Sequence, residues 1–311
     1  MMAGRGELTD KTREQERGVR DRTVAQAHQH AANTRHRPSK AEARSGSTTR
    51  PTKPSGATEE TSEPSSSRRT SRVSSPEVLS RLNRHFEGAQ PKEILEWAVE
   101  TYGSRLALSA SFGGPEGMAL IDMISKITDE VSVLTIDTGF LFEETVECRE
   151  EVMRRYQLPL EVLRPSLSIE EQVERYGERM RTCSPDVCCQ VRKIEPLERA
   201  LKGYEAWMTG IRREQTPQRA STRVVGWEGR YGAAKIAPLA GWSAEQVWGY
   251  VEENGVPVNP LLMQGYKSIG CEPQTRPVSP EEDERAGRWS GLEKTECGLH
   301  WAEGRAPRGH S

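Results

Sequence analysis

The sequence predicts an α/β fold in which a mainly parallel sheet is flanked by helices. Four short apolar runs, at 105–109, 131–136, 160–163 and 206–210, have the length and composition of buried strands. Stretches with apolar residues three or four positions apart, as helices have, separate these runs. Alternation of strand and helix is typical of βαβ units, whose strands pair in parallel.

The predicted helices and one further strand pair complete this pattern. Helices are predicted from Pro76, from Pro91, across Met118–Ile124, over 142–156, around 168–176 and over 244–253. Proline in the first turn marks the first two. Residues 224–239 predict an antiparallel pair of strands around Gly229. No stretch approaches the roughly 20 apolar residues of a membrane span.

The first 75 residues have a different composition from the rest of the chain. They contain no Phe, Trp or Tyr and carry 15 Lys and Arg against 9 Asp and Glu. Such a stretch buries too little apolar surface to offset its ordering entropy, so we predict a disordered extension over 1–75. A nucleic-acid arm, a targeting peptide and a solvated extension are the three interpretations, and the mixed charges favour the last.

Beyond this extension we expect one folded domain over 76–290 and a C-terminal tail over 291–311. The sequence shows no secretory signal, and its six cysteines suggest no disulfide framework. A reducing, cytoplasmic compartment is therefore the expected location.

Three strand ends carry residues suited to an anionic ligand, because ligands in open α/β sheets bind beyond the carboxyl ends of the strands. The first holds Ser109, Ser111, Phe112 and Gly113, where small residues let backbone N–H groups approach an anion. A tight turn without a ligand explains this loop equally well. The second, Asp137-Thr138-Gly139, either contacts a ribose or base or caps the next helix.

The third strand end is rich in arginine. Gly210 is followed by Arg212 and Arg213, and then by Arg219 and Arg223. The guanidinium fork binds phosphate and sulfate through two parallel hydrogen bonds. A single arginine after a strand is usually a solvent-exposed surface residue. Two adjacent arginines beside two glycine-bearing loops favour an anion site.

The cysteines form two groups. Cys188 and Cys189 are adjacent, and Cys271 stands in a Gly-Cys-Glu-Pro turn, a pattern that favours a metal or iron–sulfur site over three structural thiols. Cys297 lies near the C-terminus, with Gly298 next to it and His300 three residues on. A thiolate in such a tail either acts as a nucleophile or is a free surface thiol.

Together these segments resemble the adenylylsulfate/phosphoadenylylsulfate reductase family of assimilatory sulfate reduction. The resemblance runs from about Leu79 to Trp301. It rests on the segments Ser109–Gly113, Leu134–Gly139, Cys188–Lys193, Gly210–Gln215, Ser268–Cys271, Glu284–Trp289 and Glu296–His300. The adjacent cysteines are similar to those of the iron–sulfur branch, which reduces adenosine 5′-phosphosulfate.

The resemblance implies an adenine-nucleotide α-hydrolase-like, Rossmann-like sheet, and makes 76–290 a nucleotide-binding reductase domain. Cys297 would attack the sulfate sulfur, release AMP and become S-sulfonated, and reduced thioredoxin or glutaredoxin would then free sulfite. The implied substrate-binding residues are Ser109, Ser111, Phe112, Gly113, Asp137, Thr138, Gly139, Lys193, Gly210, Arg212, Arg213, Arg285, Arg288 and His300. Lys193 would lie between cluster and substrate, and in an α-helix it shares a face with Cys189.

The resemblance also implies a four-iron four-sulfur cluster on Cys188, Cys189 and Cys271. Gln274 stands where such members have a fourth cysteine, and its amide is a poor iron ligand. Three outcomes stay open: a cluster on three thiolates with another fourth ligand, a cluster in which Cys183 substitutes, or no cluster.

Without a cluster, the chain would resemble the branch that reduces 3′-phosphoadenylylsulfate to sulfite and adenosine 3′,5′-bisphosphate. Two rivals come from other classes. An ATP-dependent adenylating enzyme would usually have a Ser-Gly-Gly-x-Asp-Ser loop, from which the 111–116 segment departs. A metal-stapled nucleic-acid binder leaves Cys297 without a role. A homo-oligomer is a further expectation.

Overall fold

A computed structural model of the protein describes residues 73–178 and 184–290, together with 292, 294, 296, 298 and 299. Nearly all of the predicted 1–75 extension lies outside the described residues, as do Cys183, Cys297 and His300. The predicted boundaries at 75 and 290 stay predictions. Among the described helices, none combines the length and apolarity that a membrane crossing requires.

The centre of the fold is a six-stranded sheet with the order β3-β2-β1-β4-β6-β5. Its strands are β1 (Leu106–Ser109), β2 (Ser132–Ile136), β3 (Leu160–Leu163), β4 (Ala206–Thr209), β5 (Val225–Glu228) and β6 (Ala233–Ile236). All neighbouring strands are parallel except β5 and β6, which form the predicted antiparallel pair. The mainly parallel sheet predicted from the sequence is confirmed.

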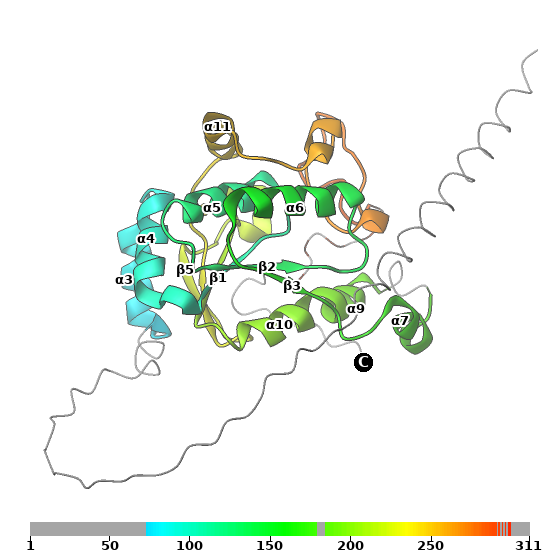
Figure 1. Ribbon diagram of the computed structural model, residues 1–311, viewed down its shortest axis with the longest axis horizontal. Helices are drawn as coiled ribbons and strands as arrows, with labels where there is room; N and C mark the ends of the chain where they lie inside the picture. The colour runs from blue at the N-terminus through cyan, green and yellow to red at the C-terminus, as the bar shows by residue number, and fades with distance from the viewer. Residues whose placement is uncertain are drawn as a thin grey trace, which may run out of the picture. The chain divides into compact units, whose positions relative to one another are not determined.

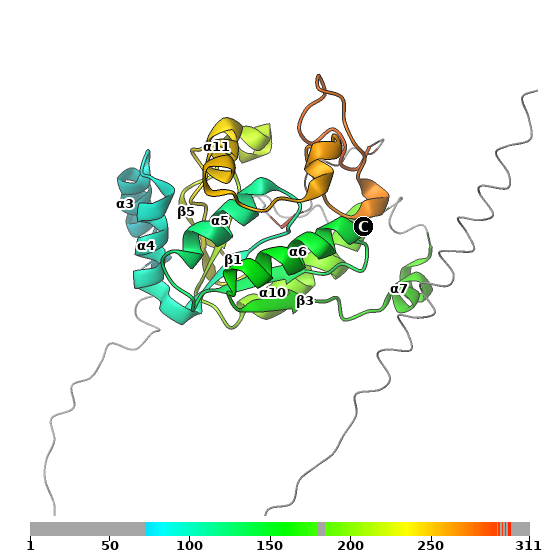
Figure 2. The same cartoon turned by 45° about the horizontal axis from the view of Figure 1, so that its top comes forward.

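Helices cover both faces of this sheet (Figure 1). They are α3 (Pro76–Phe86), α4 (Pro91–Tyr102), α5 (Pro115–Ser125), α6 (Glu143–Tyr156), α7 (Ile169–Tyr176), α9 (Pro185–Cys189), α10 (Glu195–Leu201) and α11 (Ala244–Asn254). In Figure 1, α5 and α6 lie on one face and α9 and α10 on the other. Short helical turns are η1 (Gly103–Arg105), η2 (Gln190–Ile194), η3 (Arg213–Gln215), η4 (Pro217–Arg219), η5 (Pro260–Gln264) and η6 (Glu272–Gln274). The orange segment that carries η5 and η6 lies on the same side of the sheet as α6, in Figure 1 and in Figure 2.

Two apolar cores follow from the period-two alternation of the strands. On β1, Leu106 and Leu108 point into the larger core, which α5 and α6 share, whereas Ala107 points into a smaller core. On β4, Trp207 joins Ala107 and packs with Leu197 and Leu201 of α10. Since both faces are buried, the strands need continuous apolar runs, which is the pattern seen in the sequence.

Strand register brings the predicted anion loops to one edge of the sheet. Ser109 pairs with Thr209 of β4 on one side and Leu134 of β2 on the other. The loops after β1, β2 and β4 therefore leave the sheet side by side. This edge is where the residues of the candidate site gather.

The segment after Ser184 contains an irregular helical turn. Residues Gln190–Ile194 form a π-helical turn between α9 and α10, with one extra residue in the turn. Cys189 is the last residue of α9, and Lys193 lies within the π turn. Pro196 lies at the start of α10, where its missing N–H breaks the regular ladder.

We expect Gly210→Ala to destabilise the protein. An added Cβ at Gly210, directly after β4, would lie 2.8 Å from the Cβ of Glu116 on α5. Overpacking of this kind costs about 1–3 kcal/mol. Chemical denaturation measures the loss. Gly249→Ala is the matched control, because a Cβ there meets nothing within 4 Å in α11 and is expected to be neutral or stabilising. Equal stability of Gly210→Ala and wild type would contradict the close approach.

Candidate active site

The loop between β1 and α5 forms one wall of the candidate site. Phe112 adopts the left-handed conformation (φ 55°), and the Ser111 hydroxyl accepts a hydrogen bond from the Gly113 N–H at 3.4 Å. Gly114 caps α5 without a side chain, so the first N–H groups of the helix have no side-chain cap. An added Cβ on Gly113 would meet the Ile269 carbonyl at 2.8 Å, so the loop packs directly against the C-terminal segment.

A cavity of about 210 Å³ opens at this edge of the sheet. Its cationic lining residues are Lys193, Arg219, Lys267, Arg285 and Arg288, and its carboxylates are Glu116 and Glu284. Of the predicted substrate-binding residues, the lining includes Ser109, Ser111, Gly113, Thr138, Lys193, Gly210, Arg285 and Arg288. Clustered positive charge beside an uncapped helix N-terminus is suited to a multiply charged anion.

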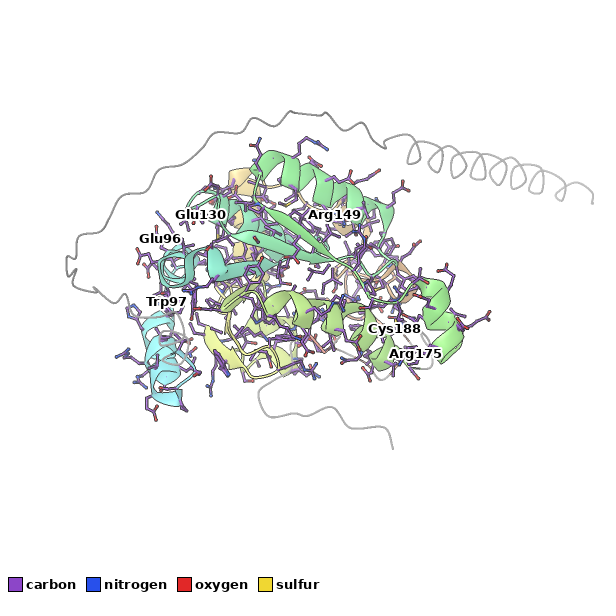
Figure 3. The ribbon with its side chains drawn as sticks, turned by 60° about the horizontal axis from the view of Figure 1, so that its bottom comes forward. Glu96, Trp97, Glu130, Arg149, Arg175 and Cys188 are labelled. Atoms are coloured by element: carbon purple, nitrogen blue, oxygen red, sulfur yellow. The ribbon has the colours of Figure 1, made fainter. Side chains whose placement is uncertain are left out.

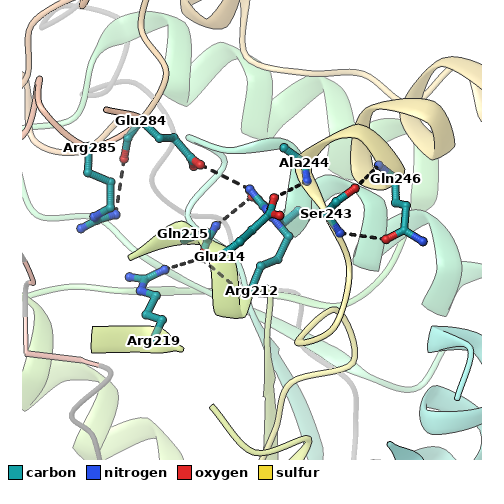
Figure 4. A network of polar contacts seen from close by, with 11 residues as sticks. Arg212, Glu214, Gln215, Arg219, Ser243, Ala244, Gln246, Glu284 and Arg285 are labelled. Atoms are coloured by element: carbon teal, nitrogen blue, oxygen red, sulfur yellow. Dashed lines mark hydrogen bonds and ion pairs between the residues drawn. The ribbon is translucent and has the colours of Figure 1, made fainter. Parts of the chain in front are cut away.

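Arg212 lies behind this lining rather than in it. Its side chain is only 2% exposed, and its Nε donates to Glu116 Oε1 at 2.9 Å. Its other nitrogens pair with Glu214 and, at 3.4 Å, with Glu284 (Figure 4). Arg212 thus holds two cavity carboxylates in place, and its direct contact with an anionic ligand stays a prediction.

Arg213 faces away from its neighbour. Its two terminal nitrogens donate to the Glu87 carboxylate at 2.6 and 2.9 Å, and its Nε donates to the Thr222 carbonyl. It lines a second, smaller cavity of about 120 Å³, together with Glu87 and Trp242. The structure therefore does not bring Arg213 to the first cavity. Arg219 lines the first cavity instead. The sequence indicated Arg219 only as a further arginine after Arg212 and Arg213.

The loop after β2 contributes Thr138 and Leu141 to the cavity lining. Thr138 faces the cavity, whereas Asp137 accepts a hydrogen bond from the Gly139 N–H at 3.0 Å and lies 3.6 Å from Arg164. Buried Arg192 donates to the Thr138 carbonyl at 2.9 Å. This loop geometry is that of a structured turn, and ligand contacts of Asp137 and Gly139 stay predictions.

Trp289 organises the cations of the C-terminal segment. Its ring lies 5.8 Å from the Arg285 guanidinium, 4.5 Å from that of Arg288 and 5.3 Å from the Lys294 ammonium. The indole is 2% exposed, and its backbone has φ 50°. Cation–π attraction to one ring offsets part of the repulsion between these side chains. Arg288 also donates to the Ile269 carbonyl at 3.2 Å, which fixes it against Gly270.

Cys271 lines the cavity beside Thr138, whose hydroxyl lies 3.4 Å from the sulfur. Burial raises the pKa of the Cys271 thiol, but the charge of Lys193 and the contact with Thr138 outweigh it, so the pKa lies below its ordinary value. Cys188 has the opposite balance, because burial and the charge of Cys271 raise its pKa. The π turn thus carries Lys193 toward Cys271.

The described cysteines do not form a complete ligand set for a cluster. Cys188, which Figure 3 labels, and its neighbour Cys189 both belong to α9 and are buried, and Cys188 interacts electrostatically with Cys271. Across residues 73–178 and 184–290, however, no three Cys, His, Asp or Glu side chains converge as metal ligands would. Gln274 occupies the turn position of the expected fourth cysteine, and Cys183 lies outside the described residues.

Two described residues near Cys297 in the sequence contact the cavity, Glu296 before it and Leu299 two positions after it. Glu296 pairs with Arg219 at 2.7 Å and with Arg285 at 3.4 Å. Leu299 lines the cavity and packs against the smaller core. Sequence reasoning missed Glu116, Glu284, Lys267 and Glu296 as parts of this site. The three carboxylates are distinguished from other charged residues only by their pairing with arginines in three dimensions, and Lys267 only by its place in the cavity lining.

Comparison with known proteins assigns this architecture to a family. The family model described as the phosphoadenosine phosphosulfate reductase domain matches residues 105–277, more than half of the chain. The chain belongs to the phosphoadenosine phosphosulfate reductase family. A protein from Halalkalibacterium halodurans described as adenosine 5′-phosphosulfate reductase is 47% identical over 71% of this chain and 96% of its own length. One from Gloeobacter violaceus, described as phosphoadenosine 5′-phosphosulfate reductase, is 46% identical over 72% of this chain and 93% of its own length.

The family's fold is also seen in a solved structure. The phosphoadenylyl-sulfate reductase of Candida auris, in its phosphate complex, is 35% identical and has a TM-score of 0.58. The match covers 65% of this chain and 98% of the Candida auris chain. The resemblance inferred from the sequence motifs and the predicted fold class are both confirmed.

We expect Glu284→Gln to change how stability depends on pH. Burial and the charge of Glu116 raise the pKa of Glu284 above its ordinary value of 4.5, despite Arg212. The folded state therefore favours the protonated form of Glu284. Its contribution to the free energy of unfolding is fully present below about pH 4 and is lost as pH rises through the raised pKa. Chemical denaturation of both proteins between pH 4 and 7 should show that the stability of the wild type relative to Glu284→Gln decreases as pH rises. A pH-independent difference would contradict this assignment.

Proposed function

We propose that this protein reduces adenosine 5′-phosphosulfate to sulfite and AMP, with Cys297 as the nucleophile. The observation that carries the proposal is that Glu296 and Leu299, on either side of Cys297 in the sequence, contact the wall of a cavity with five cationic lining residues. Family membership supplies the chemical class, and the names of the relatives supply the nucleotide. Together these observations favour a nucleophilic thiolate directed at a bound anion.

The charge of the cavity suits this reaction. A thiolate that attacks a sulfate group brings two anions together, so the transition state needs fixed positive charge nearby. Arg219, Arg285 and Arg288 present guanidinium groups, and Lys193 and Lys267 present ammonium groups. Because hydrogen bonds and ring contacts already hold Arg219, Arg285 and Arg288, little reorganisation is needed during the reaction.

The proposed reaction has two stages. In the first, the Cys297 thiolate attacks the sulfate sulfur, the bond from that sulfur to the phosphate oxygen breaks, and AMP leaves. In the second, a thiolate of reduced thioredoxin or glutaredoxin attacks the Cys297 sulfur, and sulfite leaves with the bonding electron pair. The second thiol of the reductant then resolves the mixed disulfide. Two electrons pass from the dithiol to the sulfur of the substrate.

The cavity walls suggest where the nucleotide lies. The uncapped start of α5 and the small residues Ser109, Ser111 and Gly113 are suited to the phosphate. We propose that Thr138 and Gly210, at two other strand ends, contact the nucleoside. The contacts assigned by resemblance to Phe112, Asp137, Gly139, Arg212 and His300 remain part of the proposal, whereas Arg213 lines the second cavity and is left out of it.

The iron–sulfur cluster stays a prediction from the resemblance. Cys188, Cys189 and Cys271 are the residues that would hold it, and their described arrangement does not complete a ligand set. We therefore assign no step to a cluster. Burial raises the pKa of the Cys271 thiol, but Lys193, Thr138 and Arg288 together bring it below the ordinary value. Reduction of 3′-phosphoadenylylsulfate is the second candidate function, because Gln274 and the names of two similar proteins favour it. A cytoplasmic location and a homo-oligomer also stay expectations.

We expect Cys297→Ser to abolish sulfite formation while the affinity for AMP changes little. The hydroxyl of serine is far less nucleophilic than a thiolate, but the cavity cations remain. Sulfite release in the presence of thioredoxin is the activity measurement. Mass spectrometry of wild type with nucleotide and no reductant should find a sulfonate adduct on the peptide that contains Cys297. Cys148→Ser is the control, because burial raises the pKa of Cys148 to about 12 and it lies outside the cavity. Undiminished turnover of Cys297→Ser would refute the mechanism.

We expect Gln274→Cys to raise the iron content of protein purified without oxygen. The substitution supplies a fourth thiolate in the turn that carries Cys271. Iron and sulfide analysis of wild type and variant gives the readout, with Gln274→Ser as the non-ligating control. Parallel assays with the two nucleotides decide between the candidate functions. Four irons per chain in wild type would show that glutamine at 274 does not prevent assembly.

A further inference from the structure

Glu296 makes the strongest contact between the tail and the cavity wall. Its Oε1 accepts from Arg219 Nε at 2.7 Å, and its Oε2 accepts from Arg219 Nη2 at 2.7 Å, a two-bond guanidinium–carboxylate pair. Arg285 Nη2 donates to the same Oε2 at 3.4 Å, and the Thr216 hydroxyl donates to Oε1 at 3.2 Å. One carboxylate therefore satisfies donors from three positions.

This ion pair is not an ordinary surface contact. The side chains of Glu296, Arg219 and Arg285 are 17%, 10% and 16% exposed. Burial raises the pKa of Glu296, but the hydrogen bonds and charge of Arg219 bring it below the ordinary value. Exposed ion pairs contribute little to stability, whereas buried pairs with two parallel bonds fix geometry strongly.

The position of Glu296 in the sequence gives this contact its significance. Glu296 directly precedes Cys297, and consecutive Cα atoms are about 3.8 Å apart. Covalent geometry therefore keeps residue 297 close to the carboxylate that Arg219 and Arg285 hold. Leu299 supplies a second fixed point on the other side.

We propose that Glu296 is a positioning residue, which docks the tail on Arg219 and Arg285 so that Cys297 meets the bound sulfate group. The role rests on the proposed function, because it presumes that Cys297 is the nucleophile. The role also explains why a carboxylate lies on two arginines of an anion-binding cavity. The negative charge of Glu296 weakens the attraction of Arg219 and Arg285 for the substrate, and correct placement of Cys297 would compensate for that loss of affinity.

Substrate affinity and the rate of adduct formation can therefore distinguish a positioning role of Glu296 from a purely structural one. Glu296→Gln removes the negative charge but keeps the size of the side chain. Arg219 and Arg285 then attract anions more strongly, so AMP and the substrate should bind equally well or more tightly. The thiol is held less firmly, so transfer of the sulfonate group to Cys297 should slow by about 10-fold or more at saturating nucleotide. A loss of stability alone would not raise the affinity for nucleotide while it lowers the rate of adduct formation.

The experiment compares Glu296→Gln, Glu296→Asp and a matched control with the wild-type chain. The control is Glu282→Gln, which removes another arginine–carboxylate pair, with Arg276 at 2.7 Å, from the same C-terminal segment but away from the cavity. Single-turnover mass spectrometry with adenosine 5′-phosphosulfate and no reductant gives the rate of adduct formation. Hydrogen exchange of the peptide covering 291–311, measured without nucleotide, reports docking independently of chemistry.

The expected result is slow adduct formation and faster exchange in Glu296→Gln, partial recovery in Glu296→Asp, and wild-type behaviour in Glu282→Gln. Wild-type adduct formation in Glu296→Gln, or a matching loss of AMP affinity, would overturn the positioning role and leave the proposed function standing. No adduct in the wild-type chain would refute the proposed function, and the positioning role with it. Faster exchange in Glu296→Gln alone would then still identify Glu296 as a structural anchor of the tail.

Discussion

The buried guanidinium of Arg212 is the interaction on which the candidate site depends. It joins Glu116 at the start of α5, Glu214 in the turn after β4 and Glu284 in the C-terminal segment. These segments are far apart in the sequence, and no apolar core holds all three together. Removal of one partner of such a network leaves buried charge without compensation, which is far costlier than the loss of a surface pair. The shape of the cavity therefore depends on a charge that does not itself line it.

The arginines of this edge divide into two groups with different partners. Arg192, Arg212 and Arg213 bond to carbonyl oxygens, an amide oxygen or carboxylates of the protein. Arg219 and Arg285 line the cavity and share Glu296. The first group builds loops rigid enough to hold the second group close together. A cavity lined with like charges needs such support, because repulsion would otherwise separate the side chains.

The sequence predicted the sheet well and the roles of the charged residues poorly, for physical reasons. The periodicity of apolar residues in strands and helices reflects local burial. The apolar segments that form β1 and β4, and the helices that begin at Pro76 and Pro91, could therefore be predicted from the sequence. Adjacent Arg212 and Arg213 look equivalent in the sequence, yet Arg212 has an extended backbone whereas Arg213 begins the η3 turn. Which carboxylate each one meets depends on segments about 70 to 130 residues away. The π turn at Lys193 was equally unreadable, because no local pattern distinguishes it from an α-helix.

A nucleophile carried on a tail must satisfy two opposing demands. On the proposed function, it meets the nucleotide in the cavity and later meets a protein reductant that is too large to enter the cavity. A purely apolar anchor would satisfy the first demand, but its burial would not respond to the charge of the ligand. A carboxylate on two arginines does respond, because any anion that reaches Arg219 and Arg285 competes with Glu296 for the same guanidinium groups. On the proposed function, the strength of the contact that positions Cys297 therefore depends on the anion in the cavity, substrate and products alike.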